Sequence, residues 1–130
     1  FSDATIDYRD WFVPQRVGEG FINSYWTWVC RNENPNIDWR TLRDEFLNNG
    51  GDGVYGAWKL TYLEPMFQRR TLLGRECFIS RDNFDGYQLG SCRVAEYLQP
   101  RLFQFKTNYW NLSRAYEQAE ILHKTLKAFS

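Results

Sequence analysis

The segment from Tyr55 to Glu64 holds the residue types in this sequence that are best suited to binding a ligand. The aromatic side chains of Tyr55, Trp58 and Tyr62 lie there beside the charges of Lys59 and Glu64. Aromatic rings stack on planar or sugar rings, and a few polar groups then fix the orientation of the bound molecule. We therefore take all five as candidate substrate-binding residues. The alternative is that the whole segment is a strand that only packs the sheet.

The order of residues within this segment predicts which side chains point at a ligand. If residues 54–60 are extended, alternation places Tyr55 and Lys59 on one face and Trp58 on the opposite face. A lysine buried against the sheet would need a charged partner, so we expect Tyr55 and Lys59 to face the ligand and Trp58 to pack beneath them. A bulge at Gly56 would instead bring both sets of side chains to one face.

The rest of the sequence offers no persuasive catalytic set, and we assign no catalytic or metal-binding residue. His123 is the only histidine, which leaves catalytic triads and His-based metal sites without support, and we expect it at the surface or near a helix end. A desolvated lysine can form a Schiff base, yet a lysine that extends its amine to solvent is far commoner, and Lys59 is interpreted that way. Gly50, Gly51, Gly53 and Gly56 lack the GxxxxGK[ST] order of a phosphate loop, and a helix C-cap explains the first two.

Composition limits the possible partners and compartments. Lysine and arginine together number 16, as do aspartate and glutamate, and this balance argues against a nucleic-acid partner, which requires a basic excess. No run of about 18 apolar residues is present, so no membrane-spanning segment is expected. Cys30, Cys77 and Cys92 have the spacing of neither a zinc site nor a disulfide framework, and they indicate reduced thiols in a cytoplasmic protein.

The sequence patterns predict a series of strands and helices that would position these residues. Residues 1–21 are expected to be an irregular or extended lead-in. A strand at 24–31, apolar on both faces and therefore covered on both sides, is followed by a helix capped by Asp38 and by strand-like residues 53–65. The remaining patterns are a long loop at 68–91, a helix at 92–105 split at Pro100, a short strand at 104–110 and a last helix. This order predicts a single α+β domain over residues 1–130, with a small antiparallel sheet of about three strands flanked by helices.

The last helix has the clearest pattern, and we predict it at residues 112–129. Asn111 is a suitable N-cap residue. Apolar residues recur after it at the spacing of one helix face, at Ala115, Ala119, Leu122, Leu126 and Phe129. We expect this stripe to pack in the core.

Several pieces of the sequence, taken in order, resemble the C-terminal region of the DegT/DnrJ/EryC1/StrS family of nucleotide-sugar aminotransferases. They are INSYWTWVCR, DWRTLRDEFLNNGGDGVYGAWKLTYLEPMF, CRVAEYLQPRLFQFKTNYW and the terminal helix. In that family a strand and a helix precede a segment that often reads close to HYPxPLH, and a CPVAE-type helix, a short strand and a final helix follow. The resemblance covers roughly residues 10–130, and the order and spacing of the pieces carry it.

The resemblance implies the small C-terminal domain of a fold-type I enzyme that depends on pyridoxal phosphate (PLP). The full-length enzyme would be a homodimer that moves an amino group from a donor, commonly glutamate, to a keto-sugar nucleotide. A large N-terminal domain outside residues 1–130 would hold PLP and supply the Schiff-base lysine, so this part alone is expected to bind no cofactor and to be inactive. Its role would be to close one wall of the substrate cleft, with the segment from Tyr55 to Glu64 facing that cleft.

Departures from the family pattern bear on the identity of the substrate. Tyr55 stands where the family often has histidine, and Trp58 and Lys59 replace its proline-rich run. Arg93 replaces the proline of the CPVAE-type helix, and the stretch at 68–91 is longer than the usual linker. The sugar is therefore left open.

Two other functions are left open as well. A PLP-dependent sugar dehydratase of the same family would replace the Schiff-base lysine with histidine, at a position outside this chain. A non-catalytic carbohydrate-binding module would also be rich in aromatic residues and neutral in charge. Such a module is usually an all-β sandwich, whereas this sequence has three helical patterns.

Overall fold

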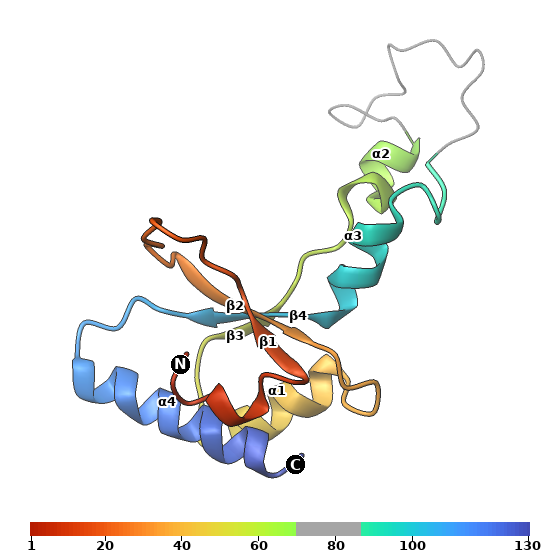
Figure 1. The fold of residues 1–130 in the computed structure, drawn as a ribbon. Coiled ribbons are helices and arrows are strands. Elements are labelled where there is room, and N and C mark those ends of the chain that lie inside the picture. The colour runs from red at the N-terminus through yellow and green to blue at the C-terminus, as the bar shows by residue number, and fades with distance from the viewer. Residues whose placement is uncertain (70–86) are drawn as a thin grey trace. The chain divides into compact units, whose positions relative to one another are not determined.

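The computed structural model describes residues 1–69 and 87–130 and shows an α+β protein (Figure 1). Its strands are β1 (Phe12–Pro14), β2 (Thr27–Asn32), β3 (Val54–Gly56) and β4 (Leu102–Lys106). Its α-helices are α1 (Trp39–Asn48), α2 (Pro65–Arg69), α3 (Arg93–Leu98) and α4 (Leu112–Lys127). Short 3-10 helices are η1 (Ile6–Tyr8), η2 (Thr61–Leu63) and η3 (Gln99–Arg101). The α+β class predicted from the sequence is confirmed.

The chain forms two compact units, where the sequence suggests a single domain. The first unit consists of residues 1–57 and 100–130, and the second consists of residues 58–99. The sheet, α1 and α4 belong to the first unit, and η2, α2 and α3 belong to the second.

The sheet is antiparallel, as predicted, but it has four strands, in the order β1-β2-β4-β3. Strand β2 is interior, and it pairs with β4 so that Trp28 lies opposite Phe105 and Cys30 lies opposite Phe103. The additional strand is β1, which falls in the stretch predicted to be an irregular or extended lead-in. Phe12 accounts for this strand, because its side chain is fully buried and the burial of a large ring stabilises even a short edge strand.

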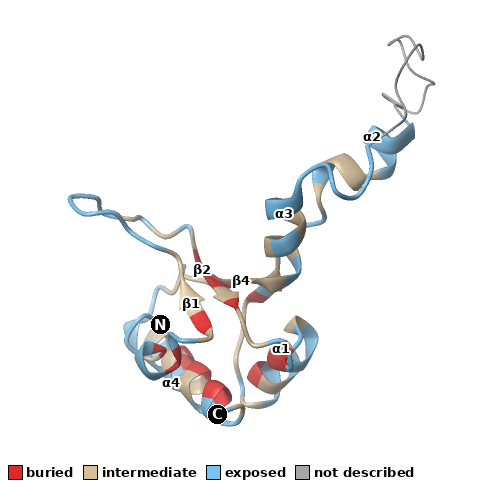
Figure 2. Cartoon of the chain, turned by 45° about the vertical axis from the view of Figure 1, so that its right-hand side comes forward, coloured by how far each residue is buried: buried red, intermediate tan, exposed pale blue. Residues whose placement is uncertain are grey.

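Helices α1 and α4 cover one face of the sheet, and the core lies between them and the strands (Figures 1 and 2). Burial alternates along β2, since Trp28 and Cys30 are buried while Thr27 and Val29 are half-buried. The prediction that this strand is covered on both sides is therefore wrong. An antiparallel sheet needs cover on one face only. The largest fully buried side chains are Phe12, Leu42, Phe46, Phe103, Phe105, Leu122 and Leu126.

Helix α1 begins and ends as the sequence predicts. The Asp38 carboxylate accepts a hydrogen bond from the Thr41 amide at 2.7 Å, and this bond holds the pKa of Asp38 below its ordinary value. After the helix, Gly50 adopts a φ of 92°, and the Gly51 amide donates to the Phe46 carbonyl at 2.9 Å. This is the Schellman arrangement of a helix C-terminus, so helix capping explains both glycines.

Helix α4 confirms the predicted last helix, although it ends at Lys127. Asn111 is its N-cap, as predicted, and its fully buried side chains are Gln118, Leu122, Thr125 and Leu126. The apolar stripe misses the two polar members of this set. Burial of these polar groups is tolerated because each has hydrogen-bond partners: Gln118 bonds the backbone of the turn after α1, and Thr125 bonds Asn49 and Ile121.

Two predicted elements near the candidate residues are shorter than the sequence suggests. The strand-like stretch at 53–65 contains only the three strand residues of β3. The helix predicted at 92–105 is correct only for α3. Residues 102–106 form strand β4, so the short strand predicted at 104–110 starts earlier, at Leu102, and ends at Lys106. Phe103 and Phe105 are both buried, at the two-residue spacing of a strand rather than that of a helix.

The second unit has no buried side chain among its described residues, 58–69 and 87–99. Polar contacts connect its parts, and Gln68 donates from its side-chain amide to the carbonyls of Tyr62 and Tyr87 at 2.7 and 2.8 Å. Most of the predicted loop at 68–91 lies outside the described residues, although its first two residues belong to α2. No helix that the structure describes is long and apolar enough to cross a membrane.

Candidate functional site

The structure divides the five candidate residues between the two units. Tyr55 lies on β3 in the first unit, whereas Trp58, Lys59, Tyr62 and Glu64 belong to the second. The alternation predicted along one extended strand stops where β3 ends. It therefore does not decide where the side chains of Trp58 and Lys59 point.

Tyr55 projects from the face of β3 that is opposite the core. Its side chain is 58% exposed, while the neighbouring Val54 is buried. Across the sheet it pairs with Gln104 of β4, whose side-chain amide donates to the Gly56 carbonyl at 3.3 Å. The sheet thus positions the Tyr55 ring and leaves it accessible to a ligand.

Trp58 and Lys59 lie just beyond the sheet, and both are exposed. The prediction that Trp58 packs beneath the other candidates is wrong, since its side chain is 83% exposed. The reason is that the chain leaves the sheet after Gly56, so the ring has no sheet face to pack on. The Trp58 ring is available to a ligand or to a partner surface.

Tyr62 uses its hydroxyl within the second unit. The hydroxyl donates a hydrogen bond to the Glu96 carboxylate. Desolvation and this bond raise the pKa of Tyr62 to about 12, and the same bond lowers the pKa of Glu96. Glu96 also accepts hydrogen bonds from the amides of Gly90 and Cys92 at 2.8 and 3.1 Å. Glu96 thus ties η2 to the turn before α3, a role that the sequence does not reveal.

Glu64 joins η2 to α2 through its backbone. Its amide donates to the Thr61 carbonyl at 3.1 Å, and its carbonyl accepts hydrogen bonds from the amides of Phe67 and Gln68, both at 3.0 Å. These bonds fix the position of Glu64 without using its carboxylate. The carboxylate therefore stays a candidate for ligand contact.

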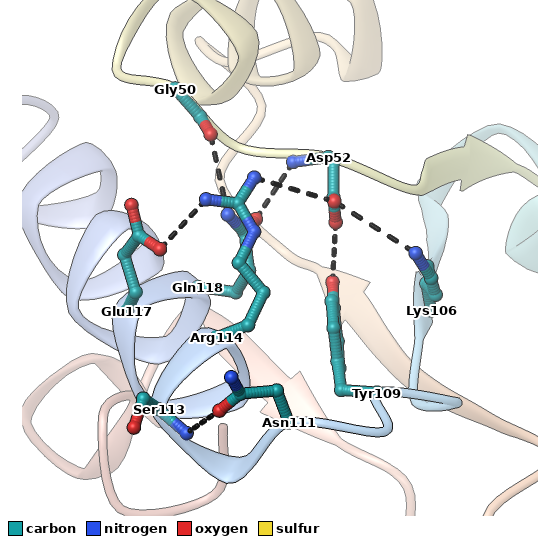
Figure 3. Close-up of polar contacts among 9 residues, drawn as sticks. All are labelled: Gly50, Asp52, Lys106, Tyr109, Asn111, Ser113, Arg114, Glu117 and Gln118. Atoms are coloured by element: carbon teal, nitrogen blue, oxygen red, sulfur yellow. Dashed lines mark hydrogen bonds and ion pairs between the residues drawn. The ribbon is translucent and has the colours of Figure 1, made fainter.

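A polar cluster that sequence reasoning misses lies at the start of β3 (Figure 3). Its centre is the Asp52 carboxylate, which accepts a hydrogen bond from the Tyr109 hydroxyl at 2.5 Å. The same carboxylate lies 3.8 Å from the Lys106 ammonium and 3.6 Å from the Arg114 guanidinium. The Asp52 amide donates to the side-chain oxygen of Gln118 at 2.7 Å. Asp52 therefore connects the turn after α1 to β4, to the loop that follows β4 and to α4.

The charges of this cluster balance one another. Arg114 also donates to the Glu117 carboxylate at 2.7 Å, and this bond raises the pKa of Arg114. Burial, together with the bond to Asp52, raises the pKa of Tyr109, so the phenol stays protonated and remains the donor. Two cations thus face two carboxylates. Such an arrangement suits the fixing of structure better than proton transfer or nucleophilic attack.

The sequence signal for this cluster is the run GGDG at 50–53. An aspartate between glycines is typical of a tight turn, and Gly53 adopts a φ of 61°. The partners of Asp52 come from β4 and α4, far along the chain. No spacing argument connects them to Asp52, so only the fold reveals the cluster.

His123 packs against the N-terminal segment and is half-buried rather than free on the surface. Its ring centre lies 5.5 Å from that of Tyr8, and its Nδ1 lies 3.1 Å from the Ala4 carbonyl oxygen. The contacts give His123 a structural role in holding the start of the chain on α4.

The cysteines and acidic residues form no metal site in the part of the chain that the structure describes. Cys30 is a core residue, and burial raises the pKa of its thiol, which makes it a poor nucleophile. Cys92 is an exposed free thiol. Cys77 lies outside the described residues.

The lysines of the chain show whether residues 1–130 could hold PLP. A Schiff-base lysine is activated by desolvation in an apolar pocket. Lys59, Lys124 and Lys127 are exposed, and Lys106 is 36% exposed and faces Asp52. None of them lies in an apolar pocket, so these residues do not fit the cofactor.

Two surface hollows are lined by residues other than the five candidates. One, of about 670 Å³, is lined by residues 90–95 and Leu98, and another, of about 390 Å³, by residues 16–18 and 21–24. Neither brings together a set of side chains with recognisable chemistry.

Comparisons with models of protein families, with curated proteins and with solved structures give no match to this chain. Its function is therefore inferred from its own residues and their geometry. The exposed rings of Tyr55 and Trp58 are the strongest starting point.

Proposed function

We propose that this chain is the C-terminal part of a PLP-dependent aminotransferase that acts on a keto-sugar nucleotide. Residues 1–130 would form one wall of the substrate cleft and help to exclude water from it. The amino-group chemistry of PLP belongs to a separate N-terminal domain, since none of the lysines here fits a PLP site. The complete enzyme would be a cytoplasmic homodimer.

The observation that carries this proposal is the exposure of aromatic rings in the segment 55–64. The side chain of Tyr55 is 58% exposed and that of Trp58 is 83% exposed. The Tyr55 ring, in the first unit, and the Trp58 ring, in the second, are each free to stack on a sugar or a base. The charges of Lys59 and Glu64 are suited to hydroxyl and phosphate groups. The order β2, α1, segment 55–64, α3, β4 and α4 is also the order that the family resemblance leads us to expect.

The rival functions make different predictions. A carbohydrate-binding module would also expose aromatic rings, but the α+β fold, with helices α1 and α4 on the sheet, differs from the usual all-β sandwich. A dehydratase of the same family would remove a hydroxyl group from the sugar, whereas an aminotransferase would add an amine to it. Identification of the product formed by the complete enzyme separates the dehydratase from the aminotransferase.

Substitutions in the exposed segment are expected to weaken the sugar half-reaction. Tyr55→Phe removes one hydrogen-bonding group and should lower kcat/KM about threefold to tenfold, while Lys59→Ala removes a charge and should lower it about tenfold to hundredfold. Both side chains are exposed, so the free energy of unfolding should change by less than about 0.5 kcal/mol. Stopped-flow kinetics of the complete enzyme with the keto-sugar nucleotide would measure the first effect, and urea unfolding the second.

Matched control variants are available on α4. Tyr116→Phe and Lys127→Ala alter exposed residues of the same types and should leave the kinetics unchanged. A loss of stability with unaltered kinetics for Tyr55→Phe and Lys59→Ala would show that the segment only packs the fold, and the site assignment would then be wrong.

Residues 1–130 alone are expected neither to form a Schiff base with PLP at a defined site nor to transaminate. Incubation with PLP, reduction with borohydride and peptide mapping by mass spectrometry should show slow labelling scattered over Lys59, Lys106, Lys124 and Lys127. The reason is that none of these amines is desolvated. Stoichiometric labelling of Lys59 alone would overturn this expectation.

A further inference from the structure

Tyr55 can contribute to binding only if β3 holds its ring in one place, and β3 is poorly suited to do so alone. The strand has three residues and lies at the edge of the sheet, with β4 as its single neighbour. Short edge elements with few backbone bonds open easily. The residues that lead into β3 include Gly50, Gly51 and Gly53, which are conformationally permissive.

The Asp52 cluster supplies the missing restraint from several sides (Figure 3). The backbone of the turn is held by Gln118, which accepts a hydrogen bond from the Asp52 amide at 2.7 Å and donates one to the Gly50 carbonyl at 3.3 Å. The Gly53 carbonyl accepts a hydrogen bond from the Lys106 amide at 2.7 Å. These contacts set the path of the chain two residues before Tyr55.

The Asp52 carboxylate adds contacts that the backbone cannot make. It holds the Tyr109 hydroxyl at 2.5 Å and faces the cations of Lys106 and Arg114. Lys106 lies on β4 two residues from Gln104, the cross-strand partner of Tyr55. The carboxylate therefore ties the turn before Tyr55 to the strand that pairs with it.

We propose that Asp52 is a positioning residue that holds β3 so that the Tyr55 ring meets the sugar-nucleotide substrate. This inference rests on the proposed function, because it concerns how Tyr55 would be presented to that substrate. Asp52 itself does not contact the substrate and acts through Tyr55. Asparagine at this position keeps the shape of the side chain but loses the charge that attracts Lys106 and Arg114.

A double-mutant cycle in the complete protein tests this inference. Asp52→Asn should lower kcat/KM for the sugar about tenfold to hundredfold, the loss typical of a misplaced binding group. In a Tyr55→Ala background the same substitution should change kcat/KM by less than about twofold, because there is no ring left to position. The matched control is Asp44→Asn, since Asp44 is an exposed carboxylate paired with Arg43 on α1, and it should leave kcat/KM unchanged.

A spectroscopic measurement separates positioning from a merely structural role and needs no activity. 3-Fluorotyrosine introduced at position 55 reports the surroundings of the ring by fluorine NMR. Asp52→Asn should shift or broaden this resonance at temperatures well below thermal unfolding, and Asp44→Asn should not. An unchanged resonance, or additive losses of kcat/KM in the double-mutant cycle, would overturn the inference about Asp52. An unchanged kcat/KM in Tyr55→Ala itself would instead overturn the proposed site, while the resonance would still show whether Asp52 holds the ring.

Discussion

Leu122→Ala is expected to lower the free energy of unfolding by about 2–5 kcal/mol. Leu122 is fully buried on the face of α4 that packs against the sheet and α1. Truncation to alanine removes buried apolar surface and leaves a cavity that the surrounding side chains fill only in part. Urea unfolding, monitored by far-UV circular dichroism, measures the change.

A second leucine of α4 provides a control for the effect of a Leu→Ala change on the helix itself. Leu112 is also in α4, but its side chain is 73% exposed, so Leu112→Ala should change the free energy of unfolding by less than about 0.5 kcal/mol. Equal effects of the two substitutions would show that α4 does not pack on the sheet as described.

Gly53→Ala is expected to destabilise the protein by about 2–5 kcal/mol, from two costs that add. Gly53 adopts a φ of 61°, a left-handed conformation that strains any residue with a Cβ. A Cβ at this position would also collide with the Lys106 Cβ of the neighbouring strand. Relief of this clash would move β3 away from β4. Thermal unfolding of the Gly53→Ala variant and of the unsubstituted protein measures the difference in stability.

A second glycine separates the two costs. Gly20 adopts a φ of 78°, but a Cβ there would meet no atom within 4 Å. Gly20→Ala should therefore show only the conformational cost, about 1–2 kcal/mol. If both substitutions cost the same, close packing of Gly53 on β4 contributes nothing to stability.

The elements that sequence patterns predict correctly are those determined by local chemistry. The Asp38 and Asn111 caps, the glycines after α1 and the apolar stripe of α4 each depend on residues within a few positions of one another. Strand β1 and the start of β4 were harder to predict, because Phe12, Phe103 and Phe105 are strand residues only through long-range pairing and burial. The one-sided cover of β2 likewise depends on where the helices pack, which no local pattern contains.

The candidate site likewise has features that the sequence predicts and features that only the fold reveals. The composition of the segment from Tyr55 to Glu64 draws attention to its rings and charges, and the fold adds that Tyr55 and Trp58 are exposed. The contact of Tyr62 with Glu96 and the cluster around Asp52 cannot be predicted from the sequence. In each case the partners lie on elements distant in the chain, and only folding brings them together.

The lack of a buried side chain among the described residues of 58–99 affects how such a protein can diverge in evolution. A core position such as Phe103 is constrained by the volume of its neighbours, so most replacements there cost stability. Residues 58–69 and 87–99 escape that constraint, since their main requirement is to keep donors paired with acceptors. Substitution of exposed side chains outside these contacts, such as Trp58 and Lys59, should therefore cost little folding stability. Substitutions are therefore expected to accumulate more readily at the exposed positions of this stretch than in the core.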